Sequence, residues 1–166
     1  VRAGLTNISR IDSFEVVDGQ KVPCDGKLYY RGIDIEDLVR GFTSENRFGF
    51  EETAYLLLFG KLPDREQLRQ FTGTLPACRT LPRNFTRDVI MKAPTRDIMI
   101  TLSKSILMLS AYDRRTDDIS IENVMRQSLM LISVFPMISV YGYHAFNHYV
   151  RNRSMYIHRP SHELLT

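Results

Sequence analysis

One stretch of the chain, from Gln127 to Val150, contains no Asp, Glu, Lys or Arg. As a helix it is long enough to span a bilayer. A helix that is apolar on all sides either crosses a membrane or lies at the centre of a large helical core. We favour the core helix, because the stretch has no second candidate span beside it and contains several polar side chains: Ser128, Ser133, Ser139, His144, Asn147 and His148.

The composition, 43% hydrophobic and 25% charged over 166 residues, is that of an ordinary soluble globular protein. It excludes collagen-like and intrinsically disordered classes, and the length allows one sizeable core. The chain begins at Val1 rather than Met and ends at Thr166 without a helix-stop signal. We therefore expect a fragment of a longer protein.

The charge is distributed unevenly, although the formal net charge is only +3. Residues 1–60 carry 7 basic and 10 acidic side chains, a net of −3, whereas residues 61–96 carry 8 basic and 3 acidic ones, a net of +5. Few aromatic residues are interleaved with the arginines between Arg65 and Arg96, so stacking platforms for nucleic acid are lacking. A solvated helix face is the favoured interpretation, and we expect no nucleic-acid partner.

The chain has two cysteines, Cys24 and Cys78, far apart and outside any CxxC spacing. They indicate neither a metal nor a redox motif. Two reduced thiols are typical of a cytoplasmic protein, so we expect a cytoplasmic location, without a membrane or a bound metal.

Residues 8–31 are expected to form an extended arm with one or two short hairpins. Residues 17–20 contain Asp-Gly, which suits the positive φ angles of a hairpin turn. A second turn is expected at Cys24-Asp25-Gly26, followed by a short strand at 27–31.

From Gly32 onward the pattern predicts helices. Asp34 is the expected N-cap of the first, and Gly41 the residue that closes it in the left-handed conformation. A second helix is expected from Phe50 to Phe59, ended by Gly60. A capping box of Asp64 and Gln67 opens a third, predicted to reach Phe71.

The second half of the chain is predicted to hold a short helix around Phe85 and Ile90, then two long helices. The first is capped by Thr95, ends at Tyr112 and shows one stripe at three- and four-residue spacing: Ile98, Leu102, Ile106 and Leu109. The other begins after Ser120 and runs to Tyr149, about 45 Å, with a kink expected at Pro136. The fold class is thus mainly α, multi-helical, with an extended N-terminal arm and a short β-hairpin.

Catalytic constellations are scarce in the sequence. It has no GxxxxGK[ST], GxGxxG or Gly-x-Ser-x-Gly motif. His144 and His148 lie one helical turn apart but lack the glutamate of a zinc-binding HExxH motif, and we interpret them as polar groups at a helix end. His158 and His162 are interpreted as ordinary loop residues, and the pair Glu51-Glu52 as a complement to a helix dipole.

Four segments nevertheless resemble the citrate synthase family. Residues 26–38, GKLYYRGIDIEDL, are similar to its G-x-L-x-Y-R-G-Y-x-I-x-D-L segment, and residues 50–63, FEETAYLLLFGKLP, to its FEEVAYLLLxGxLP segment. Residues 92–99 match a Pro-containing entry to a long helix. Residues 154–160 resemble a bacterial variant of the loop that follows the next long helix.

The resemblance implies condensation of acetyl-CoA with oxaloacetate to citrate and CoA. It places the catalytic Asp and both catalytic His residues in family segments beyond Thr166, so it assigns no catalytic, cofactor-binding or metal-binding residue to this chain. Acetyl-CoA would be a substrate of the parent enzyme rather than a cofactor held here, and the chain alone is expected to be inactive. A fragment of a 2-methylcitrate synthase and a non-enzymatic helical interaction module are the alternatives.

The resemblance also implies an architecture. Residues 1–32 would form the arm with its hairpin, and residues 33–166 the N-terminal, incomplete part of a large helical domain. Its two long helices, near 97–112 and 120–149, would pack across the two-fold axis of a homodimer. That packing gives the charge-free helix a reason to be apolar all round.

Overall fold

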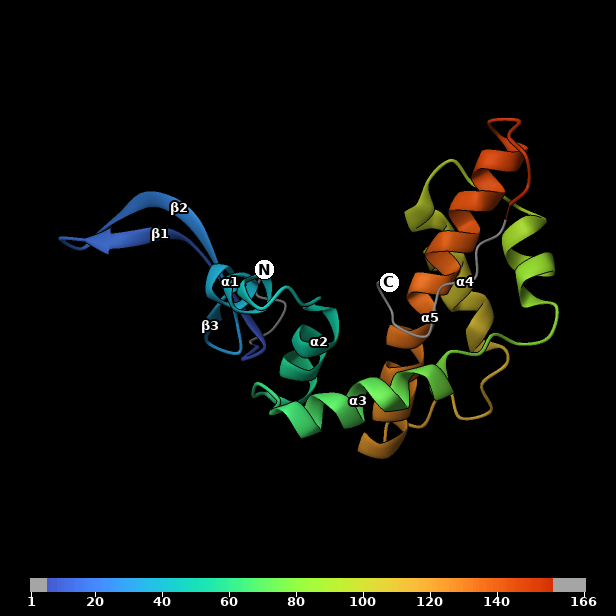
Figure 1. Cartoon of the computed structure of the whole chain (residues 1–166). Helices are drawn as coiled ribbons and strands as arrows, with labels where there is room; N and C mark the ends of the chain where they lie inside the picture. Colours follow the sequence, from blue (N-terminus) through green and yellow to red (C-terminus); the bar gives the residue numbers. More distant parts are fainter. Residues whose placement is uncertain (1–5, 157–166) are drawn as a thin grey trace. The chain divides into compact units, whose positions relative to one another are not determined.

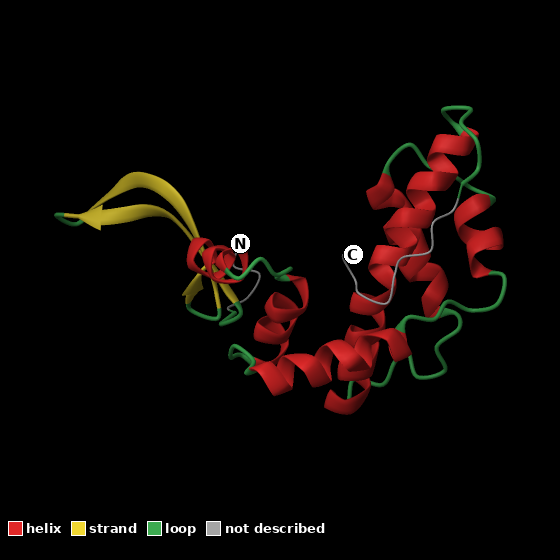
Figure 2. Cartoon of the chain, viewed as in Figure 1, coloured by secondary structure: helices red, strands yellow, loops and turns green. Residues whose placement is uncertain are grey.

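The structure is a computed structural model that describes residues 6–156. By packing, the chain divides into two units, residues 1–71 and 72–166. Figure 2 shows that the strands lie in the first unit and that helices dominate the second. This confirms the predicted mainly helical class with an N-terminal hairpin. The predicted division at residue 32 stays a prediction.

The first unit begins with a three-stranded antiparallel sheet of order β1-β2-β3, formed by β1 (Ser9–Val17), β2 (Gln20–Tyr30) and β3 (Ile33–Asp34) (Figure 1). The turn between β1 and β2 has φ +50° at Asp18 and +79° at Gly19. Both residues tolerate this left-handed region, which explains why the Asp-Gly prediction is confirmed.

The second turn expected at Cys24-Asp25-Gly26 is wrong, because β2 continues through these residues. Asp12 pairs with Lys27 and Phe14 with Pro23, so the register shifts at this point. Three residues of β2 therefore lie opposite the single Ser13 of β1. The chain accommodates the sequence Cys-Asp-Gly as an irregularity within a long strand rather than as a reversal.

The first two helices are set by their end residues. Helix α1 (Ile35–Ser44) is capped by Asp34, whose Oδ1 accepts from the N–H of Glu36 at 2.9 Å. Gly41 does not end it: the left-handed residue is Asn46, at φ +52°, and glycine permits that conformation without requiring it. Helix α2 (Phe50–Phe59) ends as predicted at Gly60, at φ +79°, whose N–H donates to the Leu56 carbonyl at 2.8 Å.

Helix α3 (Arg65–Cys78) begins in the first unit and ends in the second. The capping box is confirmed, since Asp64 Oδ1 accepts from the N–H of Gln67 at 2.8 Å and Gln67 Oε1 accepts from the N–H of Asp64 at 3.1 Å. The helix passes the predicted end at Phe71 and contains Pro76 near its C-terminus. Proline removes a single N–H there, close to where the helix ends in any case.

The core of the first unit is partly aromatic. The ring of Tyr55 lies 4.4 Å from that of Phe59 and 5.5 Å, edge-on, from that of Phe71. Leu56 is fully buried and Leu38 nearly so. These contacts fix α2 against the start of α3.

The second unit contains a π-helical segment η1 (Thr86–Met91) and two long helices, α4 (Ile98–Ser110) and α5 (Ile121–Tyr149) (Figure 1). Asp97, not the predicted Thr95, caps α4: its Oδ1 accepts from the N–H of Met99 at 2.8 Å. The hydroxyl of Thr95 is used elsewhere, on the Asp97 carbonyl and on Thr101 Oγ1 at 2.6 Å.

Helix α5 has the predicted bounds, and Ser120 caps it by accepting from the N–H of Asn123 at 3.3 Å. Pro136 lies inside it, and the kink expected there stays a prediction. Among the described residues α5 is the one helix whose length and composition would suit a membrane crossing, a test that the core helix of a soluble protein also passes. One side of α5 packs against α4 and η1 in a cluster of Phe85, Val89, Ile90, Leu109, Val134, Ile138 and Ala145.

Candidate functional site

Helix α4 carries apolar residues on the side that faces away from α5. Met99, Ile100 and Leu107 have 67%, 54% and 73% of their surface exposed. At 100° per residue they share one arc of the helix with the exposed Ser103 and Ser110. We call these five residues the outer α4 face. Exposed apolar side chains gathered in this way mark an interaction surface more often than singly scattered ones do.

The inner side of α4 is narrow, because small residues line it. Thr101 and Ser105 are buried, with 2% and 0% exposure. A Cβ placed on Gly142 of α5 would lie 2.8 Å from Thr101 Cγ2, so nothing larger than glycine fits there without a shift. The two helices therefore approach closely, and α4 is held as a rigid support for its outer face.

The link between α4 and α5 is closed by a polar network. Asp113 Oδ2 accepts from Arg126 Nη2 at 2.6 Å and from Gln127 Nε2 at 3.0 Å, and Asp113 Oδ1 accepts from the N–H of Arg115 at 3.0 Å. Asn123, fully buried, donates through Nδ2 to the carbonyls of Arg115 and Asp118 and accepts from Arg126 Nε at 2.9 Å. The network fixes the turn that sets α4 against α5.

The charge state of this network follows from its hydrogen bonds. The N–H of Arg115, then Arg126 and Gln127, lower the pKa of the Asp113 carboxyl to about 2. Because the folded pKa lies below the ordinary value of 3.8, the carboxylate stabilises the folded chain at neutral pH. That contribution is lost as the pH falls from about 4 towards 2.

The histidines do not assemble a catalytic group in the described part of the chain. His144 and His148 lie half-buried in the last turns of α5. His148 Nδ1 is 2.9 Å from the Arg153 carbonyl, so this ring contacts the backbone that follows the C-terminal end of α5. His158 and His162 lie outside the described residues. Within residues 6–156 no three His, Cys, Asp or Glu side chains gather as metal ligands.

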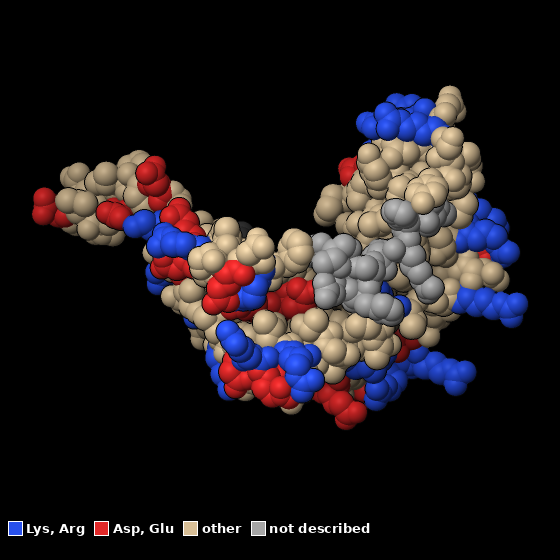
Figure 3. All heavy atoms as spheres, in the orientation of Figure 1, with Lys and Arg blue, Asp and Glu red and all other residues tan. Residues whose placement is uncertain are grey.

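The other candidate residues identified in the sequence are either ion-paired or isolated. Glu52 at the start of α2 pairs with Arg47 at 2.7 Å. Cys24 and Cys78 are not joined in a disulfide. In the basic segment, Arg69 pairs with Glu66 at 2.6 Å and Arg87 with Asp88 at 2.9 Å. Figure 3 shows acidic and basic side chains interspersed over the first unit.

The outer α4 face is therefore the candidate interaction surface, and it belongs to a mainly helical protein. The family model described as "Citrate synthase, C-terminal domain" matches residues 1–164. The chain belongs to the citrate synthase family.

Individual relatives agree with this assignment. The chain is 31% identical over 115 residues to the citrate synthase of Saccharolobus solfataricus, covering 69% of this chain and 28% of that protein. It is 32% identical over 125 residues to the 2-methylcitrate synthase of Shewanella oneidensis, covering 73% and 30%. The chain thus spans under a third of the length of these curated relatives.

A solved structure shares the fold. It is the citrate synthase of the archaeon Thermoplasma acidophilum, determined in ternary complex with carboxymethyl coenzyme A and oxaloacetate. The TM-score is 0.72 at 19% identity, over 98% of this chain and 38% of that one. This likeness confirms the mainly helical fold that the sequence predicts.

Proposed function

We propose that this chain acts as part of an enzyme that condenses acetyl-CoA with oxaloacetate to citrate and CoA. The observation that carries the proposal is the family match over residues 1–164, which includes all four motif segments. An acyltransferase of this kind must remove a proton from the methyl group of a thioester, a weak carbon acid. It therefore needs a positioned base and hydrogen-bond donors that stabilise the enol.

In this proposal the present residues supply the scaffold, and the catalytic His and Asp residues lie in other family segments. His148 contacts the carbonyl of Arg153 in its own chain, and no metal-binding cluster accompanies His144 or His148 within the part that the structure describes. We assign none of them a catalytic, cofactor-binding or metal-binding role.

The proposed partner is a second copy of the chain, bound through the helices near 97–112 and 120–149. The outer α4 face supports this choice, because Met99, Ile100 and Leu107 are more than half exposed. Helix α5 adds exposed aromatic rings at Tyr143 and Tyr149. Covering such side chains removes apolar surface from water, which drives association.

Residues 1–32 would form an arm, and residues 33–166 part of the large helical domain. The enzyme would work in the cytoplasm, without nucleic acid, membrane or metal as a partner.

The purified 166-residue chain is expected to form no citrate from acetyl-CoA and oxaloacetate, since its residues hold no assigned base. The full-length gene product that contains these residues should form citrate. Release of free CoA thiol, followed with a thiol reagent, measures both. Robust turnover by the 166-residue chain would show that catalytic groups lie within it.

A second substrate distinguishes the alternative enzyme, which the likeness to a 2-methylcitrate synthase supports. The same assay with propionyl-CoA in place of acetyl-CoA compares the two activities in the full-length protein. A larger kcat/KM for acetyl-CoA supports citrate synthesis. A larger value for propionyl-CoA replaces it with 2-methylcitrate synthesis, and no turnover with either favours the non-enzymatic module.

A further inference from the structure

The sheet of the first unit contains two tight turns of the same geometry but of different sequence. Asp18-Gly19 joins β1 to β2, with φ +50° and +79°, and Arg31-Gly32 joins β2 to β3, with φ +50° and +85°. Asp-Gly is a favoured sequence for such a turn, because Asp tolerates the left-handed region. Arginine has the same crowded Cβ but lacks the short polar side chain that lets Asp hydrogen-bond locally in this region. The turn itself therefore does not explain Arg31.

The side chain of Arg31 has a specific partner. Nε and Nη2 both donate to the carbonyl oxygen of Leu57, at 3.2 and 2.7 Å. Leu57 lies in the last turn of α2, where carbonyls lack helical donors and the helix dipole favours a cation. The guanidinium lies next to Gly60, because a Cβ built there would be in ordinary van der Waals contact with Arg31 Cζ at 4.0 Å.

The Leu57 carbonyl is the hydrogen-bond partner of the Arg31 guanidinium. Among residues 6–156 no carboxylate lies within ion-pair distance of Arg31. The backbone N–H of Arg31 also donates to the Ile8 carbonyl at 2.8 Å, next to the start of β1. Arg31 thus connects the residue that precedes β1 and the β2–β3 turn to the end of a helix 26 positions away.

We propose that Arg31 fixes the orientation of the β1–β2 hairpin and its sheet relative to the C-terminal end of α2. We call the contact between Arg31 and Leu57 the latch. The left-handed backbone aims the side chain, and the two-point contact with Leu57 fixes its direction. The hairpin bears exposed apolar side chains, among them Ile11 and Val16 at 72% and 66%. The latch keeps this exposed element in one orientation relative to α2.

Two substitutions separate the latch from the turn. Arg31→Asn provides a residue that suits the turn and cannot reach Leu57. Arg31→Lys keeps the positive charge but replaces the planar fork with a single ammonium. Arg40→Asn is the matched control, because Arg40 is an exposed arginine of α1 whose ion pair in the described part of the chain is with the exposed Asp37, at 3.2 Å.

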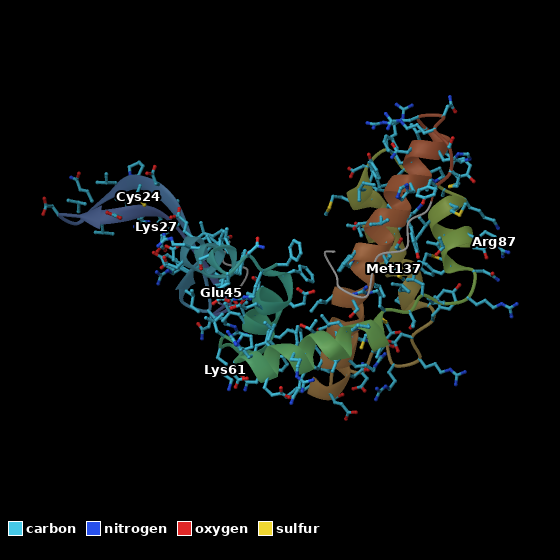
Figure 4. The ribbon with its side chains drawn as sticks, in the orientation of Figure 1. Cys24, Lys27, Glu45, Lys61, Arg87 and Met137 are labelled. Carbon is cyan, nitrogen blue, oxygen red and sulfur yellow. The ribbon has the colours of Figure 1, made fainter. Side chains whose placement is uncertain are left out.

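The measurement is the distance distribution between two spin labels within the first unit. Lys27→Cys on the hairpin and Lys61→Cys just after α2, both labelled in Figure 4, carry the labels. Cys24 and Cys78 are replaced by Ser, so that no native thiol reacts. Pulsed electron spin resonance then gives the width of the distribution for each variant.

The parent chain and Arg40→Asn should give one narrow distribution. Loss of the restraint in Arg31→Asn should broaden it about twofold, with Arg31→Lys between the two. Widths for Arg31→Asn equal to those of Arg40→Asn would overturn the proposal. Equal widths for Arg31→Lys and the parent would contradict the two-point contact.

Discussion

Replacing Leu107 with Asp should dissociate the self-associated protein into monomers. Leu107 is 73% exposed and lies on the outer α4 face. In a two-fold interface the change places an unpaired carboxylate on both copies, and an uncompensated buried charge costs about 3–5 kcal/mol. The dissociation constant should therefore rise by at least about 100-fold, since each 1.4 kcal/mol is a factor of ten. Sedimentation equilibrium measures it.

A matched control tests whether the position, rather than the charge, causes dissociation. Ile11→Asp introduces the same carboxylate at a residue that is 72% exposed, but on the hairpin of the first unit. It should leave the dissociation constant nearly unchanged. The proposed interface is wrong if Leu107→Asp associates like the parent chain, or if Ile11→Asp weakens association equally.

Replacing Phe85 with Ala should produce the largest loss of stability in the second unit. Phe85 has no exposed surface and lies in the core cluster with Ile90, Leu109 and Ile138. Its ring also meets that of Tyr112 edge-on, with 6.0 Å between centroids. Truncation removes buried apolar surface and leaves a cavity, at a cost of about 3–5 kcal/mol.

Urea unfolding measures this loss in a Leu107→Asp background, so that dissociation does not add to it. Phe48→Ala provides the control, because Phe48 is 61% exposed and undergoes the same chemical change. Its free energy of unfolding should change by about 0.5 kcal/mol or less. Similar losses for both variants would show that Phe85 is not a core residue.

The helix ends show which parts of the fold a sequence can predict. Asp34, Gly60 and Ser120 were predicted as end residues, and each is confirmed by a hydrogen bond to a near neighbour in sequence. Gly41 and the turn at residues 24–26 were wrong because glycine allows an unusual backbone without demanding it. The backbone conformation at these positions is decided by strand pairing and packing, which depend on residues distant in the sequence.

The candidate site was predicted less completely. The spacing of Ile98, Leu102, Ile106 and Leu109 predicted an apolar stripe, but the most buried positions of α4 are Thr101, Ser105 and Leu109. Close approach at Gly142 selects the small residues for the inner side. This leaves the larger Met99, Ile100 and Leu107 on the outer face. Periodicity alone does not distinguish two apolar sides of one helix.

The contact between Arg31 and Leu57 had no signal in the local pattern, because it joins a turn to a helix end 26 residues away. The motif segments were more informative about family. Residues 26–38 and 50–63 predicted the citrate synthase family, and the match over residues 1–164 confirms it.

In the proposed dimer, α4 and α5 form the surface on which a second copy packs. A photoreactive benzoylphenylalanine in place of Ile100, which is 54% exposed on the outer α4 face, tests it most directly. Isotopically light and heavy chains are mixed, illuminated and digested, and mass spectrometry identifies links between copies. Light-to-heavy links are expected from α4 of one copy to α4 or α5 of the other copy. Links within single chains only, or between copies at β1 and β2, would contradict it.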